Sequence, residues 1–371
     1  MKIVITGGLG FIGQTLARPL VAEGHDVILA DNLSAQIHGD LPLLEAPEGA
    51  RVVRVDVRDQ AALAAVLEGS DAVFHFAAET GTAQSMYRIR HYVDVNEAGT
   101  ASLLEAIASC SRRPKKLILA SSRSVYGEGA YRSADGRIVQ PQPRTQAQLA
   151  AGQWEHRDDD GAQLLPIPTP ETMLFAPGSV YAATKAAQEL LVTSASEALG
   201  LHTTILRLQN VYGEGQSLRN PYTGIISIFF NRARQDLPIP IYEDGLESRD
   251  FVHVLDVVAA FRAALAADVA NASVINVGSG VPTPVSELAN TLLAASGFSV
   301  PVGVTGQYRV GDIRHCYADL GRLRSVLGIT PQITLLQGLT RFCEWAHGQP
   351  VQVDRLDAAT EELRKKGLAR G

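Results

Sequence analysis

The sequence predicts an α/β protein built on a doubly wound parallel sheet, with a smaller α/β lobe resting on it. Short β-branched runs alternate with helical patterns through the first part of the chain, and a glycine-rich turn directly follows the first run. The chain has 371 residues, of which 46% are hydrophobic, which is enough for one large α/β unit or two lobes. This composition excludes wholesale disorder.

The expected strands of the sheet are apolar on both faces, as is typical of parallel strands buried between two layers of helices. They are Lys2–Thr6, Val27–Asp31, Arg51–Asp56, Ala72–Phe76 and Lys116–Ser121. Helical patterns lie between them at Phe11–Glu23, Ala61–Leu67 and Ala98–Ser109, and Gly24 is expected to cap the first helix. This β-α-β-α alternation predicts the doubly wound sheet.

The alternation breaks between Tyr126 and Tyr181, in a stretch rich in Pro, Gln, Gly and charge that we interpret as an insertion at about 128–178. A helix over Val180–Leu199 and a strand over Thr203–Leu208 follow. We predict a cofactor-binding domain at 1–212 that contains the insertion, and a substrate-binding lobe at 213–348 that is interleaved with it. In this lobe we expect the strand Ser273–Val277 and helices at Ile225–Ala233, Val254–Ala267, Pro284–Ala295 and Leu335–Ala346. The tail, 349–371, is expected to be a peripheral helix or a frayed end.

Charge and cysteine content exclude several classes of protein. The formal net charge of −6 argues against a dedicated nucleic-acid binder, although local arginines can still hold a small anion. The three cysteines, Cys110, Cys316 and Cys343, form no disulfide or zinc pattern, so we expect no metal. No stretch approaches the about 20 apolar residues of a membrane span, and the N-terminus does not read as a signal peptide. We expect a soluble, cytoplasmic protein.

Gly7, Gly10 and Gly13 stand at the spacing G-x-x-G-x-x-G between the first strand and the first helix. Gly7 and Gly10 let the backbone turn tightly and approach a pyrophosphate, and Gly13 lets the helix pack close to the strand. The N-terminus of this helix points free N–H groups at the anion. Asp31 lies 18 residues past Gly13, where a carboxylate bonds ribose hydroxyls and repels a 2′-phosphate. The pattern predicts a Rossmann-type domain that binds NAD rather than NADP.

A second group of residues suits proton transfer. Tyr181 and Lys185 are four residues apart on an expected helix and therefore share a face. A tyrosine with an ordinary pKa of about 10 becomes a usable base when a lysine ammonium and a cationic nicotinamide stabilise its phenolate. The stretch Ser121–Gly127 follows the fifth strand, at the edge of the sheet where ligands bind, so a serine there can bond both a substrate hydroxyl and Tyr181.

With these motifs the sequence resembles the extended short-chain dehydrogenase/reductases, the family of NAD-dependent nucleotide-sugar epimerases and dehydratases. The resemblance runs over about residues 1–345 and also carries His75–Ala78, Val95–Thr100, Leu206–Gly213, Ser248–Val254 and Arg309–Arg314. It makes Ser122 the catalytic serine beside Tyr181 and Lys185. The NAD contacts that it implies are Gly7, Gly10, Phe11, Ile12, Asp31, Asn32, Asp56, Val57, Phe76, Ala77, Ala78, Asn96, Tyr181 and Lys185. Asp56 would reach the adenine, or it is a plain surface carboxylate.

The resemblance implies a nucleotide-diphosphate sugar as substrate. Asn210, Arg249 and Arg309 would hold the diphosphate, although a surface ion pair between Arg249 and Asp250 is an alternative. Asp312 would bind the nucleoside ribose, and Thr82 and Gln84 the sugar hydroxyls. The full set of expected substrate contacts is Thr82, Gln84, Ser122, Arg123, Asn210, Ile225, Arg249, Arg309 and Asp312. Family members pair through two helices per subunit, so we expect a homodimer through Asn96–Ser109 and Val180–Leu199.

Absent residues narrow the chemistry. The 4,6-dehydratases carry an Asp-Glu pair after the catalytic residue, where this chain has Arg123 and Ser124. The cysteine of 3,5-epimerases and the glutamate of decarboxylases are also missing near Ser122. A 4-epimerase is therefore expected, with a UDP-sugar 4-epimerase, a 4-ketosugar reductase and, remotely, a non-catalytic NAD-sensing regulator as alternatives.

Among the epimerases the sequence is most similar to bacterial dTDP-L-rhamnose 4-epimerases. It shares Gln209–Gly213, Asn220–Ile225, Glu243–Asp250, Tyr308–Cys316 and an insertion that ends in Pro166–Glu171. Many of these enzymes have a Cys-Pro-x-Cys element inside the insertion. This chain has Trp154–Gly161 there, without a cysteine.

Overall fold

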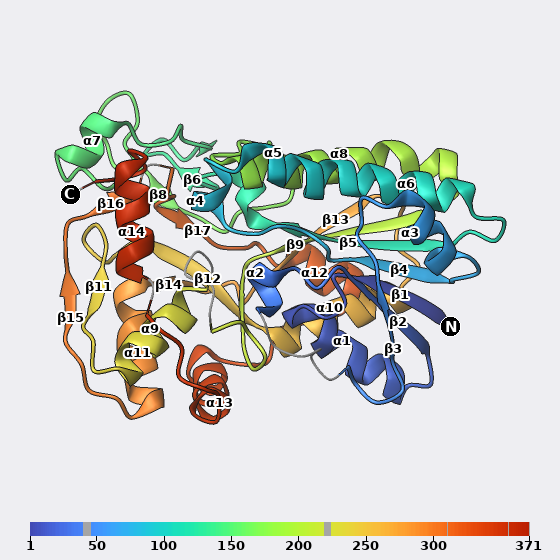
Figure 1. Cartoon of the computed structure of the whole chain (residues 1–371). Coiled ribbons are helices and arrows are strands. Elements are labelled where there is room, and N and C mark those ends of the chain that lie inside the picture. The colour runs from blue at the N-terminus through green and yellow to red at the C-terminus, as the bar shows by residue number, and fades with distance from the viewer. Residues whose placement is uncertain (40–45, 219–223, 310, 355, 371) are drawn as a thin grey trace.

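A computed structural model describes residues 1–39, 46–218, 224–309, 311–354 and 356–370. Its centre is a seven-stranded parallel sheet with the order β13-β9-β5-β4-β1-β2-β3 (Figure 1). The strands are β1 Lys2–Thr6, β2 Asp26–Asp31, β3 Arg51–Arg54, β4 Ala72–His75, β5 Lys116–Ser122, β9 His202–Leu208 and β13 Ser273–Val277. The predicted doubly wound α/β fold is confirmed.

Helices cover both faces of the sheet (Figure 1). One layer contains α1 Phe11–Ala22, α10 Val254–Ala266 and α12 Gly321–Leu327, and the other contains α3 Gln60–Leu67, α6 Gly99–Ser109 and α8 Val180–Leu199. Successive strand residues point to opposite faces. Ile3 and Ile5 therefore join the core under α1, whereas Val4 joins the core under α6.

Short helices connect the strands near their carboxyl ends. They are α2 Ala35–His38, α4 Thr82–Ser85, α5 Ile89–Tyr92, the π-helix η1 Val93–Ala98 and the 3₁₀-helix η2 Arg123–Tyr126. The helix expected from Ala98 begins at Gly99, because η1 runs directly into it. None of the helices in the described ranges is both long and apolar enough to cross a membrane.

The strand Ser273–Val277 was expected in the smaller lobe, and this placement is wrong. It pairs in parallel with β9 at the edge of the central sheet. Ile275 and Val277 are fully or almost fully buried there. A strand that is apolar on both faces suits a covered parallel sheet, and its pairing also closes the exposed edge of β9. The helix expected at Val254–Ala267 was placed in the smaller lobe as well, and this is also wrong, because Val257 and Phe261 pack in the core of the central sheet. The chain after 213 thus returns to the first domain.

The smaller lobe has its own core, formed by α9 Ile225–Arg234, α11 Val285–Ser296 and α13 Leu335–His347 around Phe230 and Phe342. Short strands surround these helices: β10 Asn210–Tyr212, β11 Ile239–Ile241, β12 Ser248–His253, β14 Pro282–Pro284, β15 Val302–Val304, β16 Tyr308–Arg309 and β17 His315–Cys316. Asn220–Thr223 and Val310, which belong to quoted motifs, lie outside the described residues.

The insertion folds into a three-stranded sheet, with β6 Tyr131–Arg132 between β7 Ile138–Val139 and β8 Leu165–Pro166, and the helix α7 Gln146–Ala150. Charged contacts join it to the smaller lobe. Arg144 donates to Glu243 at 2.7 Å, and the fully buried Arg314 donates to Glu155 at 2.6 Å. Glu155 thus lies in an ion pair within the segment Trp154–Gly161, which has no cysteine.

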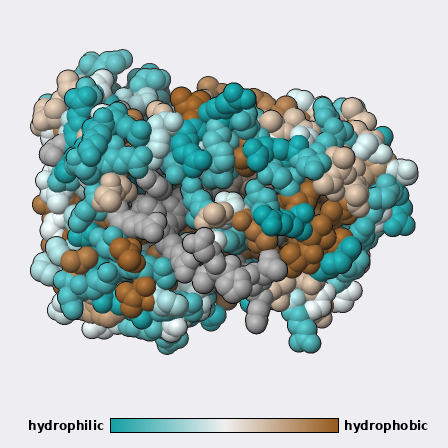
Figure 2. Space-filling view, in the orientation of Figure 1, coloured by the Kyte–Doolittle hydropathy of each residue, from teal (hydrophilic) through white to brown (hydrophobic). Residues whose placement is uncertain are grey.

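The tail forms the helix α14 Leu356–Lys365 and the strand β18 Ala369–Arg370, which pairs with β16. The helical pattern of the tail is therefore confirmed, and the alternative of a frayed end is wrong. Figure 2 shows that the surface in this part of the molecule is largely hydrophilic.

Candidate active site

The glycine turn connects β1 to α1 at the carboxyl end of the sheet. Gly7 has a φ of 65°, and a Cβ there would lie 2.8 Å from the Ala77 nitrogen. A Cβ on Gly13 would lie 2.7 Å from the carbonyl oxygens of Gly7 and Gly8. The N-cap residue of α1 is Gly10, which has no side chain that could cap the helix. The backbone N–H groups of the first turn therefore remain available to a ligand. The turn therefore fits the pyrophosphate of a dinucleotide.

Asp31 is 7% exposed at the end of β2, beside this turn. Its carboxylate accepts hydrogen bonds from the backbone N–H of Leu9 at 3.1 Å and of Leu33 at 2.9 Å. His38 Nε2 lies 3.3 Å from the same carboxylate. The negative charge that was expected to select NAD is thus held against the glycine turn.

Asn32 and Asp56 follow β2 and β3 and contact each other. Asn32 Nδ2 donates to Asp56 at 3.2 Å, and Arg58 donates to both Asp56 oxygens at 2.8 Å. The hydrogen bonds from Arg58 hold the pKa of the Asp56 carboxyl well below its ordinary value. Asp56 is therefore ionised and half-buried beside the cofactor region.

The expected contacts after β4 pack against the same turn. The backbone of Ala77 lies against Gly7, and the ring of Phe76 packs at a tilt against Phe261 with ring centroids 4.6 Å apart. Asn96 is completely buried, and its amide binds the N–H of Glu79 at 2.8 Å and Thr184 Oγ1 at 2.9 Å. The Asn96 side chain thereby joins the chain after β4 to α8. Two further expected contacts, Phe11 and Ile12, lie in the first turn of α1. A third, Val57, lies against Gly99.

Ser122 and Tyr181 meet at the carboxyl end of β5. Ser122 is the last residue of β5, and Tyr181 lies in the first turn of α8, which the Ser179 side chain caps. Burial raises the pKa of Tyr181, whereas a hydrogen bond with Ser122 and the charge of Arg123 lower it. The guanidinium of Arg123, which was expected to contact substrate, therefore also acts electrostatically on the tyrosine.

Lys185 lies one turn after Tyr181 and is 4% exposed. Its ammonium donates to the Ala120 carbonyl and to Gln188 Oε1, each at 2.7 Å. Burial lowers the pKa of Lys185 to about 8. At neutral pH the lysine is still mostly protonated, as its predicted role requires.

Gln188 connects this lysine to a buried polar chain. Its Nε2 donates to Thr100 Oγ1 at 2.7 Å. His75 Nε2 lies 2.9 Å from the same hydroxyl, and His75 Nδ1 lies 2.7 Å from Thr6 Oγ1. Burial lowers the pKa of His75 to about 3, so this histidine is neutral. Sequence reasoning assigned no role to Gln188 or Thr100, although Thr100 ends the quoted motif Val95–Thr100 and Gln188 stands three residues after Lys185.

Three arginines, Arg123, Arg249 and Arg309, were predicted to contact the substrate. Within the described ranges, no carboxylate is within ion-pair distance of Arg123, Arg249 or Arg309. Arg249 instead donates to the carbonyls of Ser248 and Ile313 at 2.8 and 2.7 Å. Burial and the nearby charge of Arg249 lower the pKa of Arg123. Arg123 and Arg249 therefore lie near each other, and arginines without an acidic partner suit a diphosphate.

The alternative of an Arg249–Asp250 ion pair is wrong. Asp250 is completely buried, and its carboxylate accepts from the N–H groups of Ser279, Gly280 and Ala318 at 2.6, 3.0 and 3.1 Å. It therefore has a structural role inside the smaller lobe.

A cavity brings several other predicted substrate residues together. Its lining includes Thr82, Ser179, Arg309, Asp312 and Leu368. Two predicted contacts lie elsewhere: the buried Gln84 amide bonds Gln36 and Tyr92, and Ile225 packs on the core of the smaller lobe. The Asn210 amide oxygen is buried without a hydrogen-bond partner among the described residues, so it is available to a ligand group.

The comparison with known families agrees with this geometry. A model of the NAD dependent epimerase/dehydratase family matches residues 3–148 and 159–278. The chain belongs to this family. The NAD prediction is thereby confirmed, and the glycine turn and the uncapped α1 N-terminus are the parts of this epimerase/dehydratase that fit the cofactor.

Similar proteins cover nearly the whole chain. A dTDP-L-rhamnose 4-epimerase of Burkholderia thailandensis is 42% identical over 93% of this chain and 94% of its own length. A UDP-glucose 4-epimerase of Mycolicibacterium smegmatis is 30% identical over 93% of this chain and 98% of its own. The solved UDP-glucuronic acid 4-epimerase of Bacillus cereus, in complex with UDP-glucuronic acid and NAD, is 25% identical, has a TM-score of 0.76, and matches over 94% of this chain and 99% of its own.

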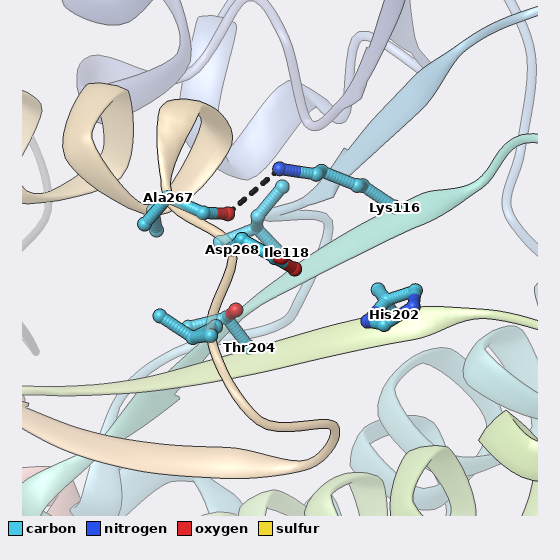
Figure 3. A pocket seen from close by; sticks show the side chains of 8 residues that line it. Lys116, Ile118, His202, Thr204, Ala267 and Asp268 are labelled. Carbon is cyan, nitrogen blue, oxygen red and sulfur yellow. Dashed lines mark hydrogen bonds between the residues drawn. The ribbon is translucent and has the colours of Figure 1, made fainter. Parts of the chain in front are cut away.

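A second hollow of this epimerase/dehydratase lies at the opposite, amino ends of β5 and β9 (Figure 3). Lys116 and Asp268 are among the residues that line it, and the Lys116 ammonium donates to the carbonyls of Leu265 and Ala267 at 2.7 and 2.8 Å. A cation at the carboxyl end of α10 stabilises that helix. Lys116 therefore has a structural partner, and the hollow is separate from the predicted chemistry.

Proposed function

We propose that this chain is a nucleotide-sugar 4-epimerase that converts dTDP-L-rhamnose into dTDP-6-deoxy-L-talose. The assignment of the substrate rests on the 42% identity to a dTDP-L-rhamnose 4-epimerase over 93% of the chain, compared with 30% identity to a UDP-glucose 4-epimerase. The meeting of Ser122, Tyr181 and Lys185 at the carboxyl end of the sheet supports the reaction class.

In this mechanism Tyr181 takes the proton of the sugar 4-hydroxyl and later returns one. Bound NAD supplies the chemistry of accepting a hydride from C4 and giving it back. Ser122 orients the 4-oxygen through its hydroxyl, and the positive charge of Arg123 lowers the pKa of Tyr181. In this proposal the ammonium of Lys185, one turn further along α8, also favours the tyrosine phenolate. The proton transfer needs no further acid.

Inversion requires the 4-keto sugar to present its other face. Arg249, Arg309 and Asn210 would hold the diphosphate, so that binding energy resides in the nucleotide while the sugar ring turns. Arg123 and Ser124 stand where dehydratases place an Asp-Glu pair, so elimination of water has no acid-base pair next to Ser122. This favours epimerisation over dehydration.

We also propose that the active form is a homodimer through α6 and α8. Leu190 and Leu191 are 56% and 36% exposed on α8, and apolar side chains of this kind are typical of a helix that packs against a second copy. Size-exclusion chromatography with light scattering tests this. A monomer at micromolar concentration would contradict it.

The test of function is a redox-neutral assay. The purified protein, without added NADH, is incubated with dTDP-L-rhamnose, UDP-glucose or UDP-glucuronate, and the sugar is followed by NMR. Interconversion of C4 epimers of the dTDP-sugar supports the proposal, and conversion of a UDP-sugar alone supports the UDP-sugar alternative. A parallel sample receives a nucleotide-linked 4-keto sugar with and without NADH, and net conversion that requires the NADH indicates a reductase. Turnover of none of these substrates indicates a non-catalytic NAD-binding protein.

A further inference from the structure

The segment Leu356–Arg370, here named the C-terminal strap, is anchored to the smaller lobe. Leu356, Ala359 and Leu363 of α14 are buried. Arg232 lies 3.1 Å from the Asp357 carboxylate, and Tyr242 OH lies 3.2 Å from Thr360 Oγ1. Figure 1 shows α14 standing at the end of the molecule that also carries α7, α9 and β16. Packing therefore fixes the strap as an integral element.

The strap sets the position of Arg309. Strand β18 pairs antiparallel with β16, so that Ala369 faces Arg309 in the register. The Arg309 guanidinium lies 4.8 Å over the ring of Tyr242, the same tyrosine that contacts Thr360. Arg309 Nε is buried without a hydrogen-bond partner among the described residues. The strap thus contacts Arg309 directly through β18 and indirectly through Tyr242, and the Nε–H of this arginine is a donor without a partner among the described residues.

The strap also reaches the cofactor-binding domain. Lys366 Nζ lies 4.4 Å from the ring centroid of Tyr87, which follows α4. Leu368 lines the same cavity as Thr82 and Met86 from that domain and as Arg309 and Asp312 from the smaller lobe. The strap therefore bridges the two parts of the molecule at the cavity.

We propose that the C-terminal strap is a wall of the substrate site, which positions Arg309 for a nucleoside diphosphate and confines the ligand with Leu368. The identity of the sugar in this proposal rests on the proposed function. The strap itself is proposed to recognise only the nucleoside diphosphate. Thr360 acts as a positioning residue through Tyr242, whereas Leu368 contacts the ligand.

Three variants of the full-length protein test the proposal. Leu368→Asp places a carboxylate in the cavity, where it repels the diphosphate, and Thr360→Val removes only the hydroxyl that faces Tyr242. Val353→Asp introduces the same charge at a side chain that is 78% exposed and does not line the cavity. We expect the KM for the sugar nucleotide, and the Kd for dTDP, to rise about tenfold or more for Leu368→Asp and about threefold to fivefold for Thr360→Val. The kcat should fall by a smaller factor, and Val353→Asp should behave as wild type.

Hydrogen exchange supplies a measurement independent of turnover. Saturating dTDP, or UDP in a parallel sample, should slow amide exchange in the strap and in β16 of the wild-type protein. Unchanged exchange, or equal Kd values for Leu368→Asp and Val353→Asp, would overturn the strap proposal even if the epimerase assay succeeds. Slowed exchange in a protein that turns over no sugar nucleotide would support the strap proposal and contradict the proposed function. If the protein binds neither dTDP nor UDP, the strap proposal and the proposed function are both contradicted.

Discussion

Replacing Gln188 by glutamate puts a carboxylate beside the ammonium of Lys185. The two side chains are 2.7 Å apart, and the residues are 1% and 4% exposed. In the wild-type protein, burial lowers the pKa of Lys185 to about 8. The lysine therefore loses its proton as the pH rises through about 8, and turnover should fall over the same range because the phenolate of Tyr181 loses a neighbouring positive charge.

The size of the effect follows from Coulomb's law. Opposite charges about 4 Å apart attract by about 4 kcal/mol at an effective dielectric constant of about 20. A change of one in pKa corresponds to about 1.4 kcal/mol, so the full attraction would raise the pKa of Lys185 by about 3. Burial of the new carboxylate opposes part of this. We therefore expect the alkaline limb of kcat to move from about pH 8 to about pH 9 or 10 in Gln188→Glu.

The assay is kcat against pH for the wild-type protein, Gln188→Glu and Gln188→Met. The methionine variant removes the acceptor without adding charge, so its alkaline limb should stay at or below that of the wild type. Circular dichroism and NAD content establish that each variant is folded and loaded. An alkaline limb that stays in place in folded Gln188→Glu would refute the reasoning that Lys185 is the titrating group.

Three further predictions concern the catalytic tyrosine, a buried ion pair and the diphosphate. Tyr181→Phe should fold and bind NAD but turn over at least about 100-fold more slowly, and near-wild-type kcat would contradict its role as base. Glu189→Gln should lower the free energy of unfolding, measured in urea, by about 3 kcal/mol. The reason is that the buried Arg207, which donates to Glu189 at 2.8 Å, loses its counter-charge. An unchanged urea midpoint would count against this. Arg249→Met should raise the KM for the sugar nucleotide by about tenfold or more, measured from initial rates, and an unchanged KM would exclude a diphosphate contact.

Local patterns predicted most of the elements correctly. The helix Val180–Leu199 and the strand Lys2–Thr6 have the expected bounds, because a 3.6-residue period and a β-branched run are properties of adjacent residues. The glycine turn was predictable for the same reason, since its chemistry depends on spacing within seven residues. The family motifs extended this to Ser122, Tyr181 and Lys185.

Contacts between distant segments were not predictable in the same way. Ser273–Val277 reads as a strand, but its sequence does not say that its partner is β9. Likewise, Gln188 and Thr100 are ordinary polar residues until the fold brings them together 2.7 Å apart. The pairing of β18 with β16 joins residues about sixty positions apart and turns an apparent tail into part of the cavity.

The transfer of hydrogen at C4 tests the central claim most directly. Incubating the protein with dTDP-L-rhamnose that carries deuterium at C4 follows that hydrogen through the reaction in ordinary water. The account predicts that both C4 epimers form and that each retains the deuterium, because the hydride removed from C4 returns to C4. Loss of the deuterium to solvent would contradict the account. A product that is inverted at a carbon other than C4 would also contradict it.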